Sequence, residues 1–316
     1  MSTATTQSPR SRSVIKAVYA NEVSEGVGAK VRRSIGSPEL RNLSPFLMLD
    51  HFRATPGAGF PDHPHRGQTT VTYMIDGMSK HEDFLGNEGL LEPGDVQWMT
   101  AGKGIMHSEI PYFDPDPARA VTPVGMQLWI DLPKEQKFIE PSYQEKKAKD
   151  IDVITPSDGV EITIISGESH GIKGFVRPVG GCWYFNIRLT KSGAKVFQPI
   201  PEGWTTFIYI VSGNIQIGDD PTIYDKFNTL VLSSQDGQNG VHLQRPESPT
   251  DDEEEETRFM LVAGQPLDQP VVQYGPFVVN TNRQAMEAIR DFQSGKNGFE
   301  NAVGWESKIG KEFRAH

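Results

Sequence analysis

Two short phrases of the chain each carry a pair of potential metal ligands separated by one residue. The first holds His63 and His65, and the second holds His107 and Glu109. Residues i and i+2 of a β-strand point to the same face, so each phrase can aim both of its ligands into one interior. Three imidazoles and one carboxylate suit a divalent first-row transition metal, with Fe²⁺ as the first choice and other divalent transition metals as alternatives.

The spacing alone leaves the kind of site open. A structural zinc site usually takes four protein ligands in a tetrahedron. The same four ligands arranged octahedrally would leave two positions for other molecules. A His-x-His pair also occurs in proteins without a metal, so buried or surface histidines are the alternative to a metal site.

The composition narrows the class of protein. The 316 residues exceed the usual size of one hydrophobic core, so two domains are expected. A net charge of −10 argues against direct binding of nucleic acid through a broad basic face. Cys182 is the only cysteine, which excludes an internal disulfide and fits a reducing compartment. No apolar stretch approaches the length of a membrane span, and no membrane association is expected.

The strand signals predict an all-β protein. Many short β-runs are separated by glycine and proline, a pattern typical of sandwiches and barrels; examples are residues 71–75, 126–130 and 259–263. The first run ends at Asp76 and Gly77, a pair typical of a hairpin turn. Helical periodicity appears late in the chain, over residues 283–292, with Asn282 as a candidate N-cap.

An internal repeat relates two parts of the chain. Residues 69–77 align with residues 205–213, because both begin with Thr-Thr and end with glycine. The same offset places Pro199 and Pro201 at the positions of the first two histidines. Proline offers no side-chain ligand, so the second β-domain is expected to hold no metal; His242 alone matches a histidine of the second phrase.

These signals give the expected domain boundaries. Residues 1–12 are predicted to be a disordered tail, and residues 13–140 a metal-binding domain. Residues 141–316 are predicted to be a domain without metal ligands that ends in a helix and a tail.

Longer phrases of the chain resemble the pirin family, which are bicupins of the cupin superfamily. The phrases that carry the resemblance are residues 24–36, 60–67, 93–102, 198–204 and 275–282. The resemblance implies two tandem antiparallel β-sandwich or barrel (cupin) domains, with a few short helices mainly near the C-terminus. It also implies iron held in the first domain by His63, His65, His107 and Glu109. The general cupin motif has a glutamate shortly after the two histidines, whereas this chain has Gln68-Thr69-Thr70 there.

Two activities are associated with the family. One is flavonol (quercetin) 2,3-dioxygenase activity, which would make this chain an enzyme with a flavonol-like molecule and dioxygen as substrates. The alternative is a nuclear, iron-dependent transcriptional co-regulator that binds a transcription-factor protein. The resemblance thus implies localisation to nucleus and cytoplasm. A third hypothesis is a scaffold that the metal merely stabilises.

Further residues have expected roles. Glu109 is the predicted catalytic residue, either as a ligand or as the base that takes the flavonol hydroxyl proton. Five apolar side chains near the two phrases are candidates for substrate binding, with barrel core as the alternative: Phe52, Phe60, Met74, Trp98 and Met106. Three polar side chains are candidates for orienting the ligands: Asp62, Gln97 and Gln127. A basic segment could face an acidic partner, with an ordinary solvated strand as the alternative: Lys30, Arg32 and Arg33.

Overall fold

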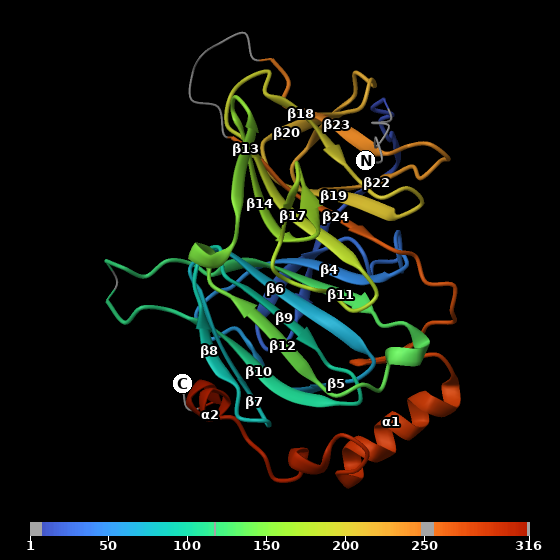
Figure 1. Ribbon diagram of the computed structural model, residues 1–316. Coiled ribbons are helices and arrows are strands. Elements are labelled where there is room, and N and C mark those ends of the chain that lie inside the picture. Colours follow the sequence, from blue (N-terminus) through green and yellow to red (C-terminus); the bar gives the residue numbers. More distant parts are fainter. Residues whose placement is uncertain (1–7, 117, 248–255, 315–316) are drawn as a thin grey trace. The chain divides into compact units, whose positions relative to one another are not determined.

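The computed structural model describes residues 8–116, 118–247 and 256–314, and the chain forms two compact units. We call the unit of residues 21–150 and 267–316 the first sandwich, and the unit of residues 1–20 and 151–266 the second sandwich. Each contains one sheet of seven strands and one of four, and every pairing within these sheets is antiparallel. The expected all-β fold with two cupin-like domains is confirmed (Figure 1).

The first sandwich places its two sheets around the candidate ligands. Its large sheet has the order β12 (Ser142–Lys146), β9 (Val96–Thr100), β6 (Gln68–Asp76), β11 (Val124–Asp131), β4 (Phe46–Arg53), β3 (Ala29–Arg33) and β2 (Asn21–Glu25). Its small sheet has the order β5 (Phe60–His65), β10 (Ile105–Tyr112), β7 (Met78–Asp83) and β8 (Glu88–Leu91).

The second sandwich repeats this arrangement. Its large sheet has the order β1 (Val14–Tyr19), β22 (Asn228–Leu232), β19 (Thr205–Ser212), β24 (Thr257–Gly264), β17 (Cys182–Leu189), β14 (Val160–Ser166) and β13 (Val153–Ser157). Its small sheet has the order β18 (Lys195–Pro199), β23 (Gly240–Gln244), β20 (Asn214–Ile217) and β21 (Ile223–Asp225). A small pair, β15 (Glu168–Ser169) and β16 (Ile172–Lys173), also lies in this unit.

The C-terminal segment belongs to the first sandwich. It contains the pair β25 (Val272–Tyr274) and β26 (Phe277–Val279), helix α1 (Asn282–Ser294) and helix α2 (Lys308–Arg314). Helix α1 is capped by Thr281, one residue before the expected Asn282, because the Thr281 side chain accepts a hydrogen bond from the Gln284 amide. Helix α2 lies against β5, β7 and β10 (Figure 1). Three 3₁₀ turns complete the helical elements of the described residues: η1 (Lys134–Gln136), η2 (Ala148–Asp150) and η3 (Glu300–Ala302).

The units differ from the expected boundaries at both ends of the chain. Strand β1 pairs with β22, so the N-terminal strand lies in the second sandwich. The last residue of the expected disordered tail is ordered, because Arg12 is buried and donates to the carbonyls of Pro201 and Trp204. Residues 1–7 lie outside the described residues. These pairings are distant in sequence, so local patterning does not reveal them.

Gly77 is a crossing point between sheets instead of the turn of a hairpin. Strand β6 pairs with β9 and β11, whereas β7 pairs with β10 and β8 in the other sheet. Gly77 has φ +62°, and a Cβ there would lie 2.7 Å from Pro123, so glycine is required. Gly213 makes the matching crossing between β19 and β20 at φ +66°. No described helix is long and apolar enough to cross a membrane.

Candidate metal centre

Strands β5 and β10 bring the two ligand phrases side by side. Strand β5 is the edge of its sheet, which is where Pro61 and Pro64 are tolerated because an edge strand needs fewer backbone donors. His63 lies directly opposite His107 in the register. The two sequence phrases therefore meet across one antiparallel pair, as the spacing argument requires.

Strand β5 contains a bulge between Phe60 and His63. His107 faces His63 and Glu109 faces Phe60, so β5 has one residue more than β10 over this stretch. Asp62 lies in the bulge, and its carboxylate accepts hydrogen bonds from the hydroxyl and amide of Ser307, just before α2. The expectation that Asp62 orients an imidazole is therefore wrong: it holds the C-terminal helix.

The three histidines form a compact, buried group. One ring nitrogen from each histidine lies within 4.8 Å of the corresponding nitrogens of the other two, and His65 and His107 are each 1% exposed. Burial, reinforced by the neighbouring imidazoles, lowers the pKa of His65 and of His107 well below the usual range. Both rings are therefore neutral near pH 7 and carry a free lone pair, which is the form that binds a metal.

The histidine geometry fits a transition metal. The Nδ1 of His63 lies 2.9 Å from the Pro61 carbonyl and donates to it, which leaves Nε2 as the acceptor. This Nε2 lies 2.9 Å from the Nε2 of His107. Ligands at right angles around one ion would be about 3.0 Å apart for metal–nitrogen bonds of about 2.1 Å, and tetrahedral ligands about 3.4 Å. The observed separation is short enough for both nitrogens to bind one ion.

Two buried polar atoms beside the histidines point to the same conclusion. Within the described part of the chain, neither His107 Nδ1 nor Gln68 Oε1 has a hydrogen-bond partner. The Gln68 side-chain nitrogen lies 2.8 Å from Nδ1 of His65. With this amide rotated, its oxygen would accept a hydrogen bond from Nδ1 of His65, and Nε2 would carry the lone pair that a metal needs. Gln68 carries no ligand spacing of its own, so sequence reasoning missed this role.

Glu109 lies beside the histidines, yet it is held by neutral donors. One of its carboxylate oxygens is 3.8 Å from Nε2 of His107. Thr72 donates its hydroxyl to the other oxygen at 2.8 Å, and the Gln127 amide lies 3.2 and 3.3 Å from the two oxygens. Gln127 therefore positions the carboxylate instead of an imidazole. Thr72, which the sequence argument missed, shares this task.

A polar row runs across the large sheet beneath Glu109. Residues directly opposite one another in neighbouring strands share a face. The register places five polar residues side by side: Arg33, Asp50, Gln127, Thr72 and Gln97. Arg33 and Asp50 form a bidentate ion pair, with nitrogen–oxygen distances of 2.8 and 2.6 Å. Burial raises the pKa of Asp50, although the Arg33 guanidinium opposes that shift.

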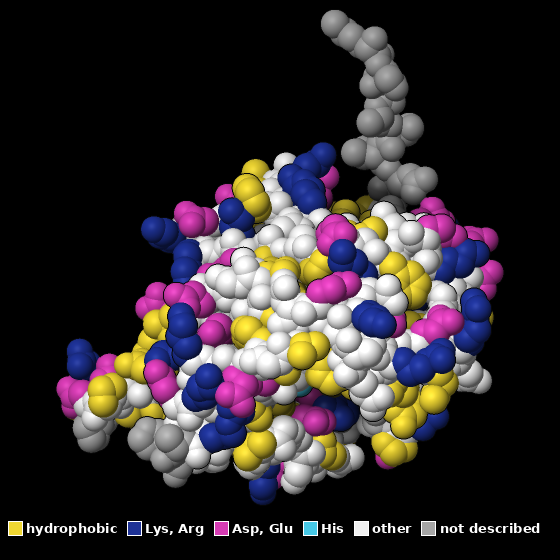
Figure 2. Space-filling view, turned by 90° about the horizontal axis from the view of Figure 1, so that it is seen from below, with side chains coloured by type: hydrophobic (Ala, Val, Ile, Leu, Met, Phe, Trp, Pro, Cys, Tyr) yellow, Lys and Arg dark blue, Asp and Glu magenta, His cyan; other side chains and the backbone are white. Residues whose placement is uncertain are grey.

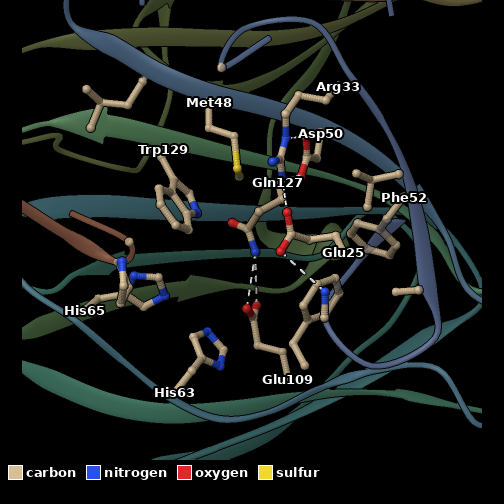
Figure 3. A pocket seen from close by; sticks show the side chains of 18 of the residues that line it. Glu25, Arg33, Met48, Asp50, Phe52, His63, His65, Glu109, Gln127 and Trp129 are labelled. Carbon is tan, nitrogen blue, oxygen red and sulfur yellow. Dashed lines mark hydrogen bonds and ion pairs between the residues drawn. The ribbon is translucent and has the colours of Figure 1, made fainter. Parts of the chain in front are cut away.

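A cavity of about 1010 Å³ opens over this row. His63, His65 and Glu109 line one end, while Arg33 and Asp50 line the other (Figure 3). The walls between the ends are apolar and come from the neighbouring rows of the same sheet: Val31 and Phe52 on one side, Met48 and Trp129 on the other. The first sandwich therefore joins a histidine cluster to a space large enough for a small organic molecule.

Two of the five expected substrate residues line the cavity, namely Phe52 and Phe60. Met74 is fully buried and packs beneath them in a core cluster. Trp98 follows Gln97 on β9 and so points to the opposite face. Met106 precedes His107 and packs against a separate cluster with Phe84. These three residues are core, because proximity in sequence to a ligand does not decide the face of a strand.

The basic segment is divided between two surroundings. Arg33 faces the cavity and bonds to Asp50 and Glu25. Lys30 is 67% exposed and pairs with Glu22 at 3.0 Å. The charge of Arg33 is paired inside the first sandwich, whereas an acidic protein partner for the segment stays a prediction.

Comparisons with known proteins agree with this architecture. The family model for pirin matches residues 28–130, and the model for the pirin C-terminal cupin domain matches residues 184–298. Pirin of Mus musculus is 48% identical over 303 residues, covering 95% of this chain and 99% of the mouse protein. A pirin-like protein of Solanum lycopersicum is 48% identical over 300 residues, covering 95% of this chain and 97% of the tomato protein.

A solved structure has a similar fold over nearly the whole chain. The crystal structure of quercetin 2,3-dioxygenase from Acinetobacter baumannii has a TM-score of 0.79 and 32% identity. The match covers 92% of this chain and 99% of that one. From its sequence and its two sandwiches, the chain belongs to the pirin family.

Proposed function

We propose that the chain is a metal-dependent flavonol 2,3-dioxygenase of the quercetinase type, with Fe²⁺ held by His63, His65, His107 and Glu109. The observation that carries the proposal is a carboxylate beside a three-histidine cluster, with His63, His65 and Glu109 all lining one large cavity. The likeness to the Acinetobacter dioxygenase supports the same reaction class. Other divalent transition metals remain alternatives.

The first step assigned to the chain's own residues is the transfer of a proton. When bound, the metal supplies a Lewis acid that lowers the pKa of the flavonol 3-hydroxyl. Glu109 accepts that proton, while Thr72 and Gln127 keep its carboxylate aimed at the cavity. Phe52 and Trp129 hold the flat ring system between them and exclude water. The overall reaction consumes flavonol and dioxygen and releases carbon monoxide.

The test is aerobic incubation of the Fe²⁺-loaded protein with quercetin. We expect loss of the quercetin absorbance together with release of carbon monoxide, and neither in a variant with both His63→Ala and His107→Ala. Tight metal binding without turnover would contradict the proposal and favour the alternatives. A scaffold would then bind no partner, whereas a co-regulator would retain nuclear proteins in a pull-down that compares ferrous with ferric protein.

The surface gives little support to direct nucleic-acid binding. On the face shown in Figure 2, basic and acidic side chains are interspersed. A broad basic field would be needed to follow a phosphate backbone. We therefore propose a small molecule as the principal ligand of this chain.

A further inference from the structure

We infer that Arg33, Asp50 and Glu25 form a recognition subsite for a hydroxyl group at the far end of a flat polyphenolic ligand. The inference rests on the proposed function and specifies its substrate class. It starts from the polar row, in which Arg33 and Asp50 continue the line that begins with Gln127 under Glu109. All four residues line the same cavity, as does Glu25.

The subsite offers acceptors to a ligand. Arg33 is shared by two carboxylates: its Nη2 lies 2.6 Å from Asp50 and 2.6 Å from Glu25. One guanidinium lies between two carboxylates, and each carboxylate oxygen can accept more than one hydrogen bond. The three residues therefore leave acceptor positions for the hydroxyl of a ligand. The half-buried Arg33 and the buried Asp50 make such a bond stronger than it would be in water.

The fold itself does not need an ion pair at this place. The repeat aligns Thr72 with Ile208, and the register then places Ile164 and Phe185 at the positions of Arg33 and Asp50. The second sandwich is thus built on the same strands with an apolar pair there. Apolar residues commonly replace a buried ion pair without loss of stability. A purely structural role does not explain why the first sandwich keeps the charges beside a cavity.

The spacing of the row selects the ligand. Thr72, beneath Glu109, and Asp50 are two strands apart, which corresponds to about 9.6 Å. Apolar walls flank the row on both sides, with Trp129 and Met48 opposite Phe52 (Figure 3). A rigid, flat molecule with a hydroxyl at each end and apolar faces fits this arrangement. Among flavonols, those with ring hydroxyls should be preferred over 3-hydroxyflavone, which has no second hydroxyl.

The experiment measures binding, so it does not depend on turnover. Quercetin and 3-hydroxyflavone are titrated anaerobically into full-length protein by calorimetry, with and without Fe²⁺. In the wild type we expect quercetin to bind at least about tenfold more tightly, the scale of one charge-assisted hydrogen bond. The double variant Arg33→Met, Asp50→Leu removes both partners of the buried pair, and we expect it to lose that preference while 3-hydroxyflavone binding changes little.

Two further variants serve as an independent test and as a control. Glu25→Gln leaves the Arg33–Asp50 pair in place, so it decides the outcome should the double variant fail to fold; we expect it to lose about half of the preference on a logarithmic scale. Glu140→Gln is the matched control, because it breaks the surface ion pair with Lys103 and neither residue lines the cavity. We expect it to keep the wild-type ratio.

The results separate the two proposals. A protein that prefers quercetin but never cleaves it would contradict the dioxygenase and leave this subsite standing. An unchanged preference in the folded double variant and in Glu25→Gln would overturn the subsite alone. Binding of neither flavonol by the wild type would overturn it as well.

Discussion

The two sandwiches share a strand order but differ in what fills the middle of their large sheets. In the first, the row across the sheet is polar: Arg33, Asp50, Gln127, Thr72 and Gln97. In the second, the matching row is Ile164, Phe185, Leu261, Ile208 and Leu230, all fully buried in one core cluster. One fold thus serves as an ordinary hydrophobic core and as the wall of a site. Departures from apolar packing mark where a protein gives up stability for function.

The ligand strands differ in the same way. Pro199 faces Gly240 in the second sandwich, where His63 faces His107 in the first. Gly240 therefore lies at the position that corresponds to His107 of the first sandwich. His242 is exposed and stacks against Phe197 in a tilted arrangement. Within the described residues of the second sandwich, no group of three potential metal ligands gathers. That this half binds no metal stays a prediction, which metal analysis tests.

The largest expected effect concerns the segment that completes the first sandwich. A fragment of residues 1–149 keeps all four candidate ligands but loses the C-terminal partners of Arg66, namely Asp291 and the Asn297 carbonyl. It also loses Ser307, the partner of Asp62. We expect the fragment to be insoluble or to bind no iron, since buried charges would be unpaired and apolar surface exposed. Solubility and iron content are the measurements.

A graded control sharpens this prediction. A chain of residues 1–302 loses α2 but keeps both partners of Arg66. We expect it to fold and to bind iron more weakly than the full chain. A soluble, fully active fragment of residues 1–149 would show that neither the C-terminal segment nor the second sandwich is needed for chemistry.

Two fully buried cations, Lys137 in the first sandwich and Arg12 in the second, have different partners. Lys137 donates to the carbonyls of Gly67 and Val278 and to Asp131 at 2.5 Å. Arg12 donates to two carbonyls and the Thr206 hydroxyl, and burial lowers its pKa to about 10. Removing Lys137 leaves a buried carboxylate without its cation, whereas removing Arg12 leaves neutral groups.

We therefore expect Lys137→Met to lower the free energy of unfolding by about 3–5 kcal/mol. Arg12→Met should cost about 1–3 kcal/mol, the scale of buried acceptors that lose their donor. Guanidinium unfolding monitored by circular dichroism checks both. The double change Lys137→Met, Asp131→Leu should recover part of the loss. Equal effects of the two single changes would contradict the proposed difference.

The next effect concerns Glu109, the one acidic member of the site. Glutamine keeps its size and one acceptor oxygen but loses the charge and the basicity. We expect Glu109→Gln to retain metal, more weakly, while flavonol cleavage falls about 100-fold or more. Steady-state rates with quercetin, together with metal analysis, measure the two properties. Unchanged turnover would remove Glu109 from the mechanism.

The most gradual effect is a pH dependence of the stability of the metal-free protein. Burial lowers the folded-state pKa of His65 and His107, so the unfolded chain binds more protons below its histidine pKa of about 6.5. Stability should therefore fall as pH drops below about 6.5, by up to about 1.4 kcal/mol per pH unit for each histidine. Thermal unfolding from pH 7.5 to 5 measures this slope.

Two variants isolate the cause of that slope. His107→Phe should remove roughly half of it, since one of two histidines is gone. His242→Gln, in the second sandwich, should leave it unchanged because His242 is exposed. A slope that persists fully in His107→Phe would assign the pH dependence to other groups.

The sequence predicted what depends on local pattern. The i, i+2 spacing placed His63 with His65 and His107 with Glu109, and the β-runs gave the two sandwiches. The repeat marked the prolines of the second half. These features can be predicted because strand alternation and turn formation depend on residues only a few positions apart in the sequence.

The rest depends on pairings between distant residues. The polar row requires the register of five strands, which the sequence does not specify. Tertiary contacts also decide the position of β1 and the crossing between sheets at Gly77. The same holds for the ion pair of Arg66 with Asp291 and the hydrogen bond between Ser307 and Asp62. The acidic run of residues 251–256, which the sequence predicts to be an exposed loop, lies outside the described residues except for Glu256. Gln68 and Thr72 were missed because polar residues next to a ligand phrase carry no spacing signal.

The central claim is that one sandwich holds a metal and the other does not. Its most direct measurement is the metal content and affinity of the full chain after loading with Fe²⁺ under anaerobic conditions and removal of unbound ion. We predict one equivalent per chain, and none at high affinity in the His63→Ala, His107→Ala variant. Two equivalents in the wild type, or full occupancy in that variant, would contradict the account.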